Sequence, residues 1–505
     1  MTWDLILQHL FIVLASALLS ILAGLPLGVL AYLYPRARAA ILWVADLLQT
    51  IPSLALLGII MVVAGPGKLT VIIGITLYSL LPIVRNTCLG LQEVDPGVKE
   101  AARGMGMGRL YRLLHVEFPL AFPMVFTGVR IAVVNAIGSA VFAAFVGGGG
   151  LGSVINQGIR ISNMGMILSA TGALMVIAVL LDLAMGWFEG HLKKTHGVSR
   201  RSGIILACLM VAVAISIPFG LRNTIGDKEM ILYDGDYSET QIMDRIIKQL
   251  VESKTDLTVT IKDQMSLVNN FKALEGDKHS CDMMISYDGT LLTTYLKKDP
   301  TDVPAGESIY DFANALAMER FDMRLLKKLG FNNTYAIAVP QEIAVQYNLE
   351  TVSDLVPVAN QLTFGAEQEF FTLEGSMKYG PFTDFYGLNF KGAVPVDVGL
   401  KYNAVENQNF DVTEVYATDG LNRKVNLKIL KDDRHFFPEY NGAFLVREDT
   451  FKKFAGAAPD LEDVLNLVAG KISTEDMTEM TYQVDVLGRS ADDVAREFLQ
   501  SLDLL

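Results

Sequence analysis

Two glycine-containing stretches raise the question of nucleotide chemistry. Gly147, Gly149 and Gly152 spell Gly-x-Gly-x-x-Gly, the spacing of a dinucleotide-binding turn. Here the motif follows a long apolar run instead of a strand, so it predicts a tightly packed loop. Gly67-Lys68 is followed by Leu69, and no Gly-x-x-x-x-Gly-Lys-Ser/Thr phosphate loop occurs in the sequence. If the chain takes part in an ATP-driven process, a separate ATPase must hydrolyse the ATP.

The sequence also lacks the residue patterns that metal-dependent or nucleophilic catalysis requires. The six His residues are scattered, no Cys/His set has metal-ligand spacing, and there is no Gly-x-Ser-x-Gly nucleophile elbow. Cys88 and Cys208 fall in or near apolar runs and Cys281 stands alone in the polar half, which excludes an intrachain disulfide there. We therefore expect no metal, no cofactor and no bond-breaking step in this chain.

A third group of residues has the composition of a contact loop. In Glu100-Ala101-Ala102, the small alanines allow close helix approach, and Gly106 permits a tight turn four residues later. Pro119 suits the first turn of a following helix. These features alone also fit an ordinary amphipathic loop helix that ends at a glycine.

The full spacing of this segment resembles the coupling loop of ABC importer permeases. That loop reads Glu-Ala-Ala, three residues, Gly, nine residues, then an apolar-x-apolar-Pro ending, which Val116, Phe118 and Pro119 supply here. The resemblance implies that residues 92–119 form two short helices that seat in a groove of a cytoplasmic ABC ATPase subunit. Glu100, Ala101, Ala102 and Gly106 would then couple ATP hydrolysis to transport.

The chain divides into two halves of different composition, and these halves contain the elements that position the residues above. Of 505 residues, 51% are apolar and only 19% are charged. Residues 1–226 hold 15 basic and 8 acidic residues, whereas the remainder holds 27 basic and 47 acidic residues. The acidic half has no basic block, which argues against nucleic acid as a partner. Six apolar runs are long enough to span a bilayer: 8–33, 41–64, 69–90, 118–146, 164–188 and 203–221.

Basic residues predict the orientation of these spans. They gather in alternate loops, which places those loops in the cytoplasm: Arg36 and Arg38; Arg85, Lys99, Arg103, Arg109 and Arg112; Lys193, Lys194, Arg200 and Arg201. The first run leads directly into a second, so it is not a cleavable signal peptide. We predict a multi-pass protein of the bacterial cell membrane with an extracytoplasmic C-terminal domain. Charged residues within the spans, Asp46, Arg130 and Asp182, receive no role.

The acidic half alternates short β-rich runs with helices. Strands are predicted at 230–233, 257–261 and 282–286, and a helix that Ser238 caps is predicted to end near Glu252. This alternation favours an α/β architecture with a largely parallel sheet. Its length suits two lobes. We expect a transmembrane domain over 1–202, a sixth span and linker over 203–226, and a binding domain over 227–505. Lobe one would comprise about 229–335 and 440–505, and lobe two about 336–439.

Four motifs in this half resemble the binding proteins of osmoprotectant importers. They are Tyr287-Asp288-Gly289-Thr290, Asn332-Asn333-Thr334-Tyr335-Ala336, Tyr416-Ala417-Thr418-Asp419-Gly420 and Phe436-Phe437-Pro438-Glu439-Tyr440. The family carries choline, glycine betaine, carnitine and similar trimethylammonium compounds, and includes fusions of permease and binding domain that import ergothioneine. The resemblance implies a type II periplasmic-binding-protein fold of two α/β lobes, joined to an all-α polytopic permease domain of about six spans.

The resemblance also implies an aromatic cage of Tyr287, Tyr335, Tyr416 and Tyr440. A trimethylammonium group has no N–H to donate, but its diffuse charge is attracted to aromatic faces by roughly 0.5–2 kcal/mol per ring. Whether the cage has three or four rings stays open, and any single Tyr is as readily a packing residue. Thr290 matches a polar cleft position of the family. Asn333 fits ligand binding and turn capping equally well.

One departure bears on ligand size. Where the family often carries a ligand-holding Gln, this sequence has Gly235, and an Arg that choline binders usually carry is missing near Leu373. The loss of a bulky amide at Gly235 would open space beyond the cage. We hypothesise a ligand larger than choline, with ergothioneine as the leading candidate.

These observations predict one subunit of an ATP-driven importer that both captures and translocates a quaternary amine. A six-span half-channel needs a second copy, so a permease homodimer in membrane lipid, with two ATPases, is expected. The alternatives are a membrane-tethered sensory receptor for a quaternary amine and a membrane enzyme. The first requires a cytoplasmic signalling segment, and the longest cytoplasmic stretch is about 28 residues. The second lacks a catalytic constellation.

Overall fold

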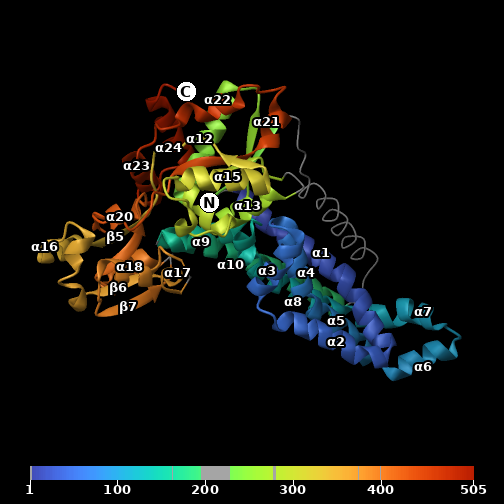
Figure 1. Ribbon diagram of the computed structural model, residues 1–505. Coiled ribbons are helices and arrows are strands. Elements are labelled where there is room, and N and C mark those ends of the chain that lie inside the picture. Colours follow the sequence, from blue (N-terminus) through green and yellow to red (C-terminus); the bar gives the residue numbers. More distant parts are fainter. Residues whose placement is uncertain (1–2, 162, 195–227, 277–279, 373–374, 398–399) are drawn as a thin grey trace. The chain divides into compact units, whose positions relative to one another are not determined.

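The computed structural model describes residues 3–161, 163–194, 228–276, 280–372, 375–397 and 400–505. Its contacts divide the chain into two compact units joined in one polypeptide. One unit comprises Met1–Asn156 and Gly165–Thr224, and the other comprises Gln157–Met164 and Ile225–Leu505. The first is helical and the second is α/β (Figure 1).

The helical unit is built from long apolar helices. In the described part of the chain, four stretches are long and apolar enough to cross a membrane: Trp3–Leu33, Lys68–Glu93, Arg109–Val146 and Met164–His191. They contain α1 (Trp3–Leu33), α4 (Lys68–Tyr78), α5 (Leu80–Glu93), α7 (Arg109–Arg112), α8 (Phe118–Ser139) and α10 (Met164–Lys194). A short helix, α9 (Leu151–Arg160), precedes α10. The predicted span at 203–221 lies outside the described residues.

The second apolar run is broken. The sequence predicts a span over 41–64, and the structure divides this stretch between α2 (Pro35–Thr50) and α3 (Ser53–Ala64), which are bent by 98°. Pro52 causes the break, since it lacks an N–H and disfavours helical geometry at the residue before it. Ile51 accordingly has φ −68° and ψ 128°, an extended conformation. The pair counts as a fifth span only if both helices are taken together.

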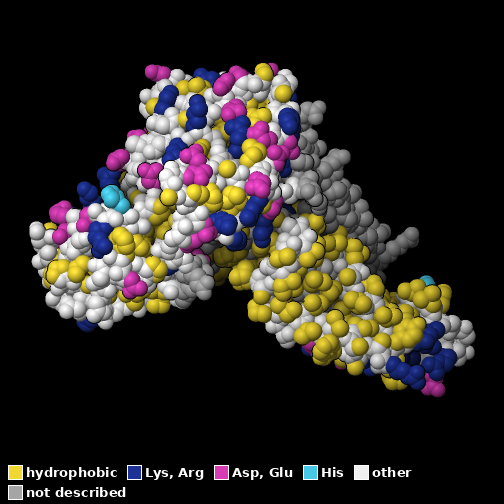
Figure 2. Space-filling model, viewed as in Figure 1, with side chains coloured by type: hydrophobic (Ala, Val, Ile, Leu, Met, Phe, Trp, Pro, Cys, Tyr) yellow, Lys and Arg dark blue, Asp and Glu magenta, His cyan; other side chains and the backbone are white. Residues whose placement is uncertain are grey.

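The predicted contact loop, residues 92–119, has two short helices with a turn between them. Asp95 caps α6 (Pro96–Gly104) by accepting a hydrogen bond from the Gly97 amide at 2.6 Å. Gly106 follows with φ +80°, in the left-handed region that favours glycine, and α7 begins at Arg109. A π-helical turn, Leu113–Glu117, connects α7 to α8, and Pro119 lies in the first turn of α8. Figure 2 shows basic side chains gathered over α6 and α7, and apolar ones over the other helices of this unit.

The described residues of the α/β unit form three sheets. The strands are β1 (Glu229–Tyr233), β2 (Thr258–Lys262), β3 (Met283–Tyr287), β4 (Met323–Leu325), β5 (Tyr335–Pro340), β6 (Thr363–Glu367), β7 (Gly392–Val396), β8 (Val412–Tyr416), β9 (Leu427–Leu430) and β10 (Gly442–Arg447). Strands β1 and β2 form a pair, the second sheet has the order β3-β10-β4, and the third has the order β7-β6-β8-β5-β9.

The prediction of a largely parallel sheet is wrong. β1 pairs with β2, and β6 pairs with β7 and β8, in parallel, but β10 is antiparallel to β3 and β4, and β5 is antiparallel to β8 and β9. Short β-rich runs separated by helices do not by themselves reveal the strand direction. The direction reverses because β5 and β10 follow the two segments through which the chain passes between the lobes.

Helices surround these sheets. Those of the first lobe are α12 (Ser238–Lys254), α13 (Leu267–Glu275), α14 (Asp288–Thr290), α15 (Ile309–Phe321), α21 (Glu448–Phe454), α22 (Leu461–Leu465), α23 (Thr474–Asp485) and α24 (Ala491–Ser501). Those of the second lobe are α16 (Gln341–Tyr347), α17 (Gln368–Thr372), α18 (Tyr379–Tyr386), α19 (Lys401–Glu406) and α20 (Leu421–Lys424). Ser238 does not cap α12 as predicted, since Tyr237 holds that position and the Ser238 hydroxyl donates to Asp485 at 2.6 Å.

Each lobe has its own hydrophobic core. Buried apolar side chains of the first lobe come from 230–331 and 443–504, and those of the main second-lobe cluster come from 337–437. Tyr335 begins β5 and so belongs to the sheet of the second lobe. Because the cores are separate, each lobe is able to keep its packing while the cleft between them changes.

Candidate ligand-binding site

Two of the predicted cage residues are cross-strand neighbours. Tyr335 on β5 is paired directly with Tyr416 on β8, so both side chains leave the same face of the sheet. Their ring centroids are 5.3 Å apart, with 35° between the ring planes. Tyr416 Oη donates to Glu367 Oε2 at 3.4 Å. The second lobe thus contributes a pair of tilted rings at the ends of two adjacent strands.

The other two tyrosines form a second pair in the first lobe. Tyr287 ends β3, and Tyr440 lies two residues before β10, which runs antiparallel to β3. Their ring centroids are 5.7 Å apart, with 30° between the planes. Gly289 makes the packing possible, since a Cβ there would lie 1.9 Å from Tyr440 Cε2. Thr290 and Tyr440 share a hydrogen bond of 3.0 Å between their hydroxyl oxygens.

A cavity of about 500 Å³ brings these residues together. All four tyrosines line it, as do Thr290 and Asn333. Asn333 donates through its backbone amide to the Tyr440 carbonyl at 3.0 Å, and its side-chain Oδ1 has no hydrogen-bond partner among the described residues. An acceptor left unsatisfied beside a cavity favours ligand binding over turn capping for Asn333.

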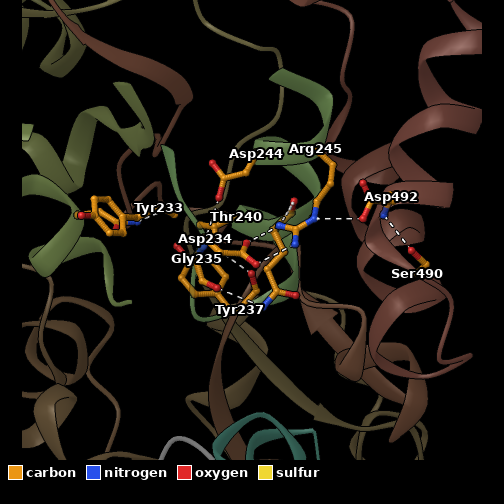
Figure 3. A network of polar contacts seen from close by, with 11 residues as sticks. Tyr233, Asp234, Gly235, Tyr237, Thr240, Asp244, Arg245, Ser490 and Asp492 are labelled. Atoms are coloured by element: carbon orange, nitrogen blue, oxygen red, sulfur yellow. Dashed lines mark hydrogen bonds and ion pairs between the residues drawn. The ribbon is translucent and has the colours of Figure 1, made fainter. Parts of the chain in front are cut away.

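Gly235 does not border the cavity, which corrects the hypothesis that a glycine at this position opens space for ligand. It is not among the residues that line the cavity, and a Cβ at this position would lie only 1.7 Å from Thr240 Oγ1. Figure 3 shows Gly235 against Thr240, next to the ion pair of Asp234 and Arg245. Glycine here permits close packing against the first turn of α12, so it adds no space for ligand. Leu373, the other departure, lies outside the described residues.

Sequence reasoning missed the two charged residues of the cavity that are buried, Glu239 and Lys401. Glu239, in the first turn of α12, is 3% exposed and accepts hydrogen bonds from Tyr287, Asn333 and Thr418. Lys401 is 1% exposed, and its ammonium lies 2.9 Å from Glu367 and 5.1 Å from the Tyr416 ring centroid. A Glu two residues after a Tyr, or one Lys among many, carries no signal of burial in a single sequence.

Burial sets the protonation of these groups. It raises the pKa of Tyr287 and of Tyr416 well above the ordinary value of a phenol, so both hydroxyls remain protonated donors at neutral pH. Burial also raises the pKa of Glu239 to about 7, although hydrogen bonds from Thr418 and Tyr287 oppose the shift. Glu239 is therefore a cavity carboxyl with a charge that changes near neutral pH.

A two-lobed α/β unit with an aromatic cavity, joined to a bundle of apolar helices, defines a class: solute-binding protein and membrane component of an importer. Comparisons with known proteins agree. Residues 231–501 match the family described as the substrate-binding domain of ABC-type glycine betaine transport systems, and residues 17–194 match the binding-protein-dependent transport system inner membrane component.

Individual relatives extend this match over the whole chain. The ergothioneine transport permease/ergothioneine binding protein EgtU of Helicobacter pylori is 32% identical over 97% of this chain and 88% of its own length. The carnitine transport binding protein OpuCC of Listeria monocytogenes is 37% identical over 52% of this chain and 83% of its own length. A solved glycine betaine/carnitine/choline ABC transporter structure is 29% identical, covering 55% of this chain and 98% of that one, with a TM-score of 0.48.

The chain belongs to the ABC import systems of the glycine betaine type, as a fusion of their membrane component and their substrate-binding domain. It is thus the transport subunit of an ATP-driven importer and not an enzyme, and a separate cytoplasmic subunit hydrolyses ATP. The sensory-receptor alternative finds no support in these matches.

Proposed function

We propose that the α/β unit captures a trimethylammonium compound in the four-tyrosine cage and hands it to the helical unit for import. The observation that carries this proposal is the meeting of two ring pairs, one from each lobe, around one cavity of about 500 Å³. A cation between π faces gains roughly 0.5–2 kcal/mol per ring, most when water is excluded. Since the two pairs come from different lobes, full enclosure requires the lobes to close.

Ergothioneine is the ligand we favour, ahead of glycine betaine, choline and carnitine. The support is the relative named for ergothioneine, which matches this chain through both units. The position of Gly235 gives no support, because that residue is packed against Thr240 and does not widen the cavity. The choice among the four compounds therefore rests on the likeness to that relative and on the experiment below.

The loop over 92–119 is the proposed docking site of the ATPase. Glu100, Ala101 and Gly106 are exposed, and Ala102 is buried, so one face of α6 packs within the loop and the other is open. Exposed apolar side chains adjoin them: Met105, Leu110, Tyr111 and Leu114. Apolar residues exposed beside basic ones are typical of a protein interface.

Orientation and assembly complete the proposal. The basic loops would face the cytoplasm and the α/β unit the outside, in a bacterial cell membrane. Two chains would form the permease as a homodimer within membrane lipid, with two ATPase subunits bound. Each transporter would then carry two fused receptors.

Isothermal titration calorimetry of the purified chain in detergent tests the ligand assignment. Ergothioneine, glycine betaine, choline and carnitine are titrated separately under one set of conditions. We expect ergothioneine to bind most tightly. Strong binding of choline or glycine betaine with none of ergothioneine would contradict the assignment, and binding of none of the four would contradict the proposed function.

A further inference from the structure

Glu239 is a carboxyl group buried inside the ligand cavity. It lies in the first turn of α12, lines the cavity with the four tyrosines, and is only 3% exposed. Its Oε1 accepts from the Tyr287 hydroxyl and from Asn333 Nδ2 at 3.2 Å, and its Oε2 accepts from the Thr418 hydroxyl. One carboxyl group thus connects a cage ring, the segment between the lobes and the second lobe.

The three donors are neutral, so none of them balances a negative charge. Among the described residues that line the cavity, Lys401 alone is basic, and its ammonium lies 2.9 Å from Glu367 and 3.5 Å from Glu414. The other acidic lining residues are Asp236, Glu369, Asp419 and Asp485. A buried carboxylate without a counter-charge is costly, and it is stabilised when a cation comes close.

A ligand cation in the cage would supply this counter-charge. The Tyr287 hydroxyl donates to Glu239 while its ring lines the cage, so an ionised carboxylate increases the electron density that the ring presents to a cation. We propose that Glu239 is the counter-charge of the cage, and that it loses its proton when a trimethylammonium ligand binds. This inference rests on the proposed function and adds a recognition residue to it.

The surroundings of Glu239 fix the direction of the pH dependence. Burial is the main cause that raises its pKa, to about 7, and the nearby Asp419 raises it further. Tyr237 and Tyr287 face it from the start of α12 and from β3, and burial keeps both phenols neutral. Asp485 on α23 is held by Ser238, the residue before Glu239. The empty site therefore carries a proton below pH 7, which a bound cation expels.

The first test measures proton release from the unmodified chain in detergent. Ergothioneine, and choline as a ligand without a carboxylate, are titrated calorimetrically at pH 6 and pH 8 in buffers with different enthalpies of ionisation. We expect close to one proton released per ligand at pH 6 and much less at pH 8. A pKa near 7 in the empty site makes the affinity roughly tenfold weaker at pH 6 than at pH 8. Equal affinity and no proton release would overturn the inference.

Two isosteric variants assign the proton. Glu239→Gln should bind at least tenfold more weakly at pH 8, since each unit of pKa change corresponds to a tenfold difference in affinity, and its affinity should not change with pH. Glu414→Gln is the matched control, because burial also raises the pKa of Glu414 but its partner is Lys401. Proton release that persists in Glu239→Gln and disappears in Glu414→Gln would overturn the assignment.

The outcomes separate this inference from the proposed function. Binding of ergothioneine or choline without proton release leaves the proposed function intact and overturns the role of Glu239. A chain that binds neither ergothioneine, glycine betaine, choline nor carnitine overturns both. The measurement on the unmodified chain decides the question even if Glu239→Gln does not fold.

Discussion

Tyr416 lies close to another ring and to a protein cation. Tyr335 lies 5.3 Å away on the neighbouring strand, and the Lys401 ammonium lies 5.1 Å from the ring centroid. The Lys401 ammonium therefore already lies near this ring, while Glu367 accepts a hydrogen bond from the Tyr416 hydroxyl. The ring is held in place by its neighbours before any ligand arrives, which lowers the entropic cost of binding.

Tyr416→Ala should weaken ligand binding severely and leave the chain folded. Loss of one cage ring removes about 1–2 kcal/mol of cation–π attraction. Polar groups that the ring covered also become exposed to water, which weakens binding further. We therefore expect binding roughly 10- to 100-fold weaker. Calorimetry measures the affinity and circular dichroism checks the fold. Tyr416→Phe is the matched control, since it keeps the ring and loses the hydroxyl group, which donates to Glu367 at 3.4 Å. An unchanged affinity of the Ala variant would remove Tyr416 from the cage.

At the scale of single residues, the sequence motifs identified the cage tyrosines but not the buried charged residues of the cavity. The four tyrosines lie in family-like motifs, and the structure brings them to one cavity. Glu239 and Lys401 were missed because their importance comes from burial, which depends on tertiary packing. Gly235 was misassigned for the same reason, as only the structure shows Thr240 filling the space beside it.

At the scale of elements, the loop between α5 and α8 is firmly attached to the first helix. Arg109 donates to the Leu33 carbonyl at 2.8 Å, and Tyr32 donates to Glu117 at 2.7 Å. Glu117 is buried and also accepts from Arg112 at 2.6 Å. A push on α6 or α7 is therefore transmitted to α1 through these polar contacts as well as through the backbone.

Gly106→Pro should disconnect ATP hydrolysis from transport. Gly106 has φ +80°, whereas proline is locked near −65°, so the turn between α6 and α7 must change. Uptake by membrane vesicles with the ATPase should fall at least tenfold while ligand affinity stays within twofold. Gly108→Ala is the control, because Gly108 has φ −62° and open space where a Cβ would lie. Transport that survives Gly106→Pro would refute the coupling assignment.

Element types were predictable from the sequence, but breaks and strand directions were less so. The helix-turn-helix of the contact loop follows from Asp95, Pro96 and Gly106, which act through local geometry. The break at Pro52 also has a local cause, but the apolar residues on both sides of Pro52 favoured the prediction of one span. Strand direction depends on how the chain crosses between the lobes, and no local pattern records that.

At the scale of the whole molecule, the two units have opposite surface chemistries. Figure 2 shows apolar side chains covering the helical unit and charged ones of both signs on the α/β unit. The acidic excess of residues 227–505, with 27 basic and 47 acidic residues, suits a receptor that attracts cations. The proposed orientation of the chain in the membrane rests on the sorting of basic loops to one side.

Cysteine labelling of intact cells tests that orientation. Val345, on α16, is 72% exposed, and Tyr34, between α1 and α2, is 55% exposed. We expect Val345→Cys to react with a membrane-impermeant maleimide and Tyr34→Cys to react only after the cells are permeabilised. The unmodified chain gives the background of its own three cysteines, of which the two in the described residues, Cys88 and Cys281, are buried. The reverse labelling pattern would invert the proposed topology.

The presence of receptor and permease in one polypeptide has a kinetic consequence. A covalently tethered domain meets its target at an effective concentration of about a millimolar, whatever the amount of protein in the cell. Docking contacts between the units then need only weak affinity, so an emptied receptor is able to leave quickly. Delivery becomes a first-order step, and uptake at low ligand concentration depends on how fast ligand reaches the cavity and not on how abundant the receptor is.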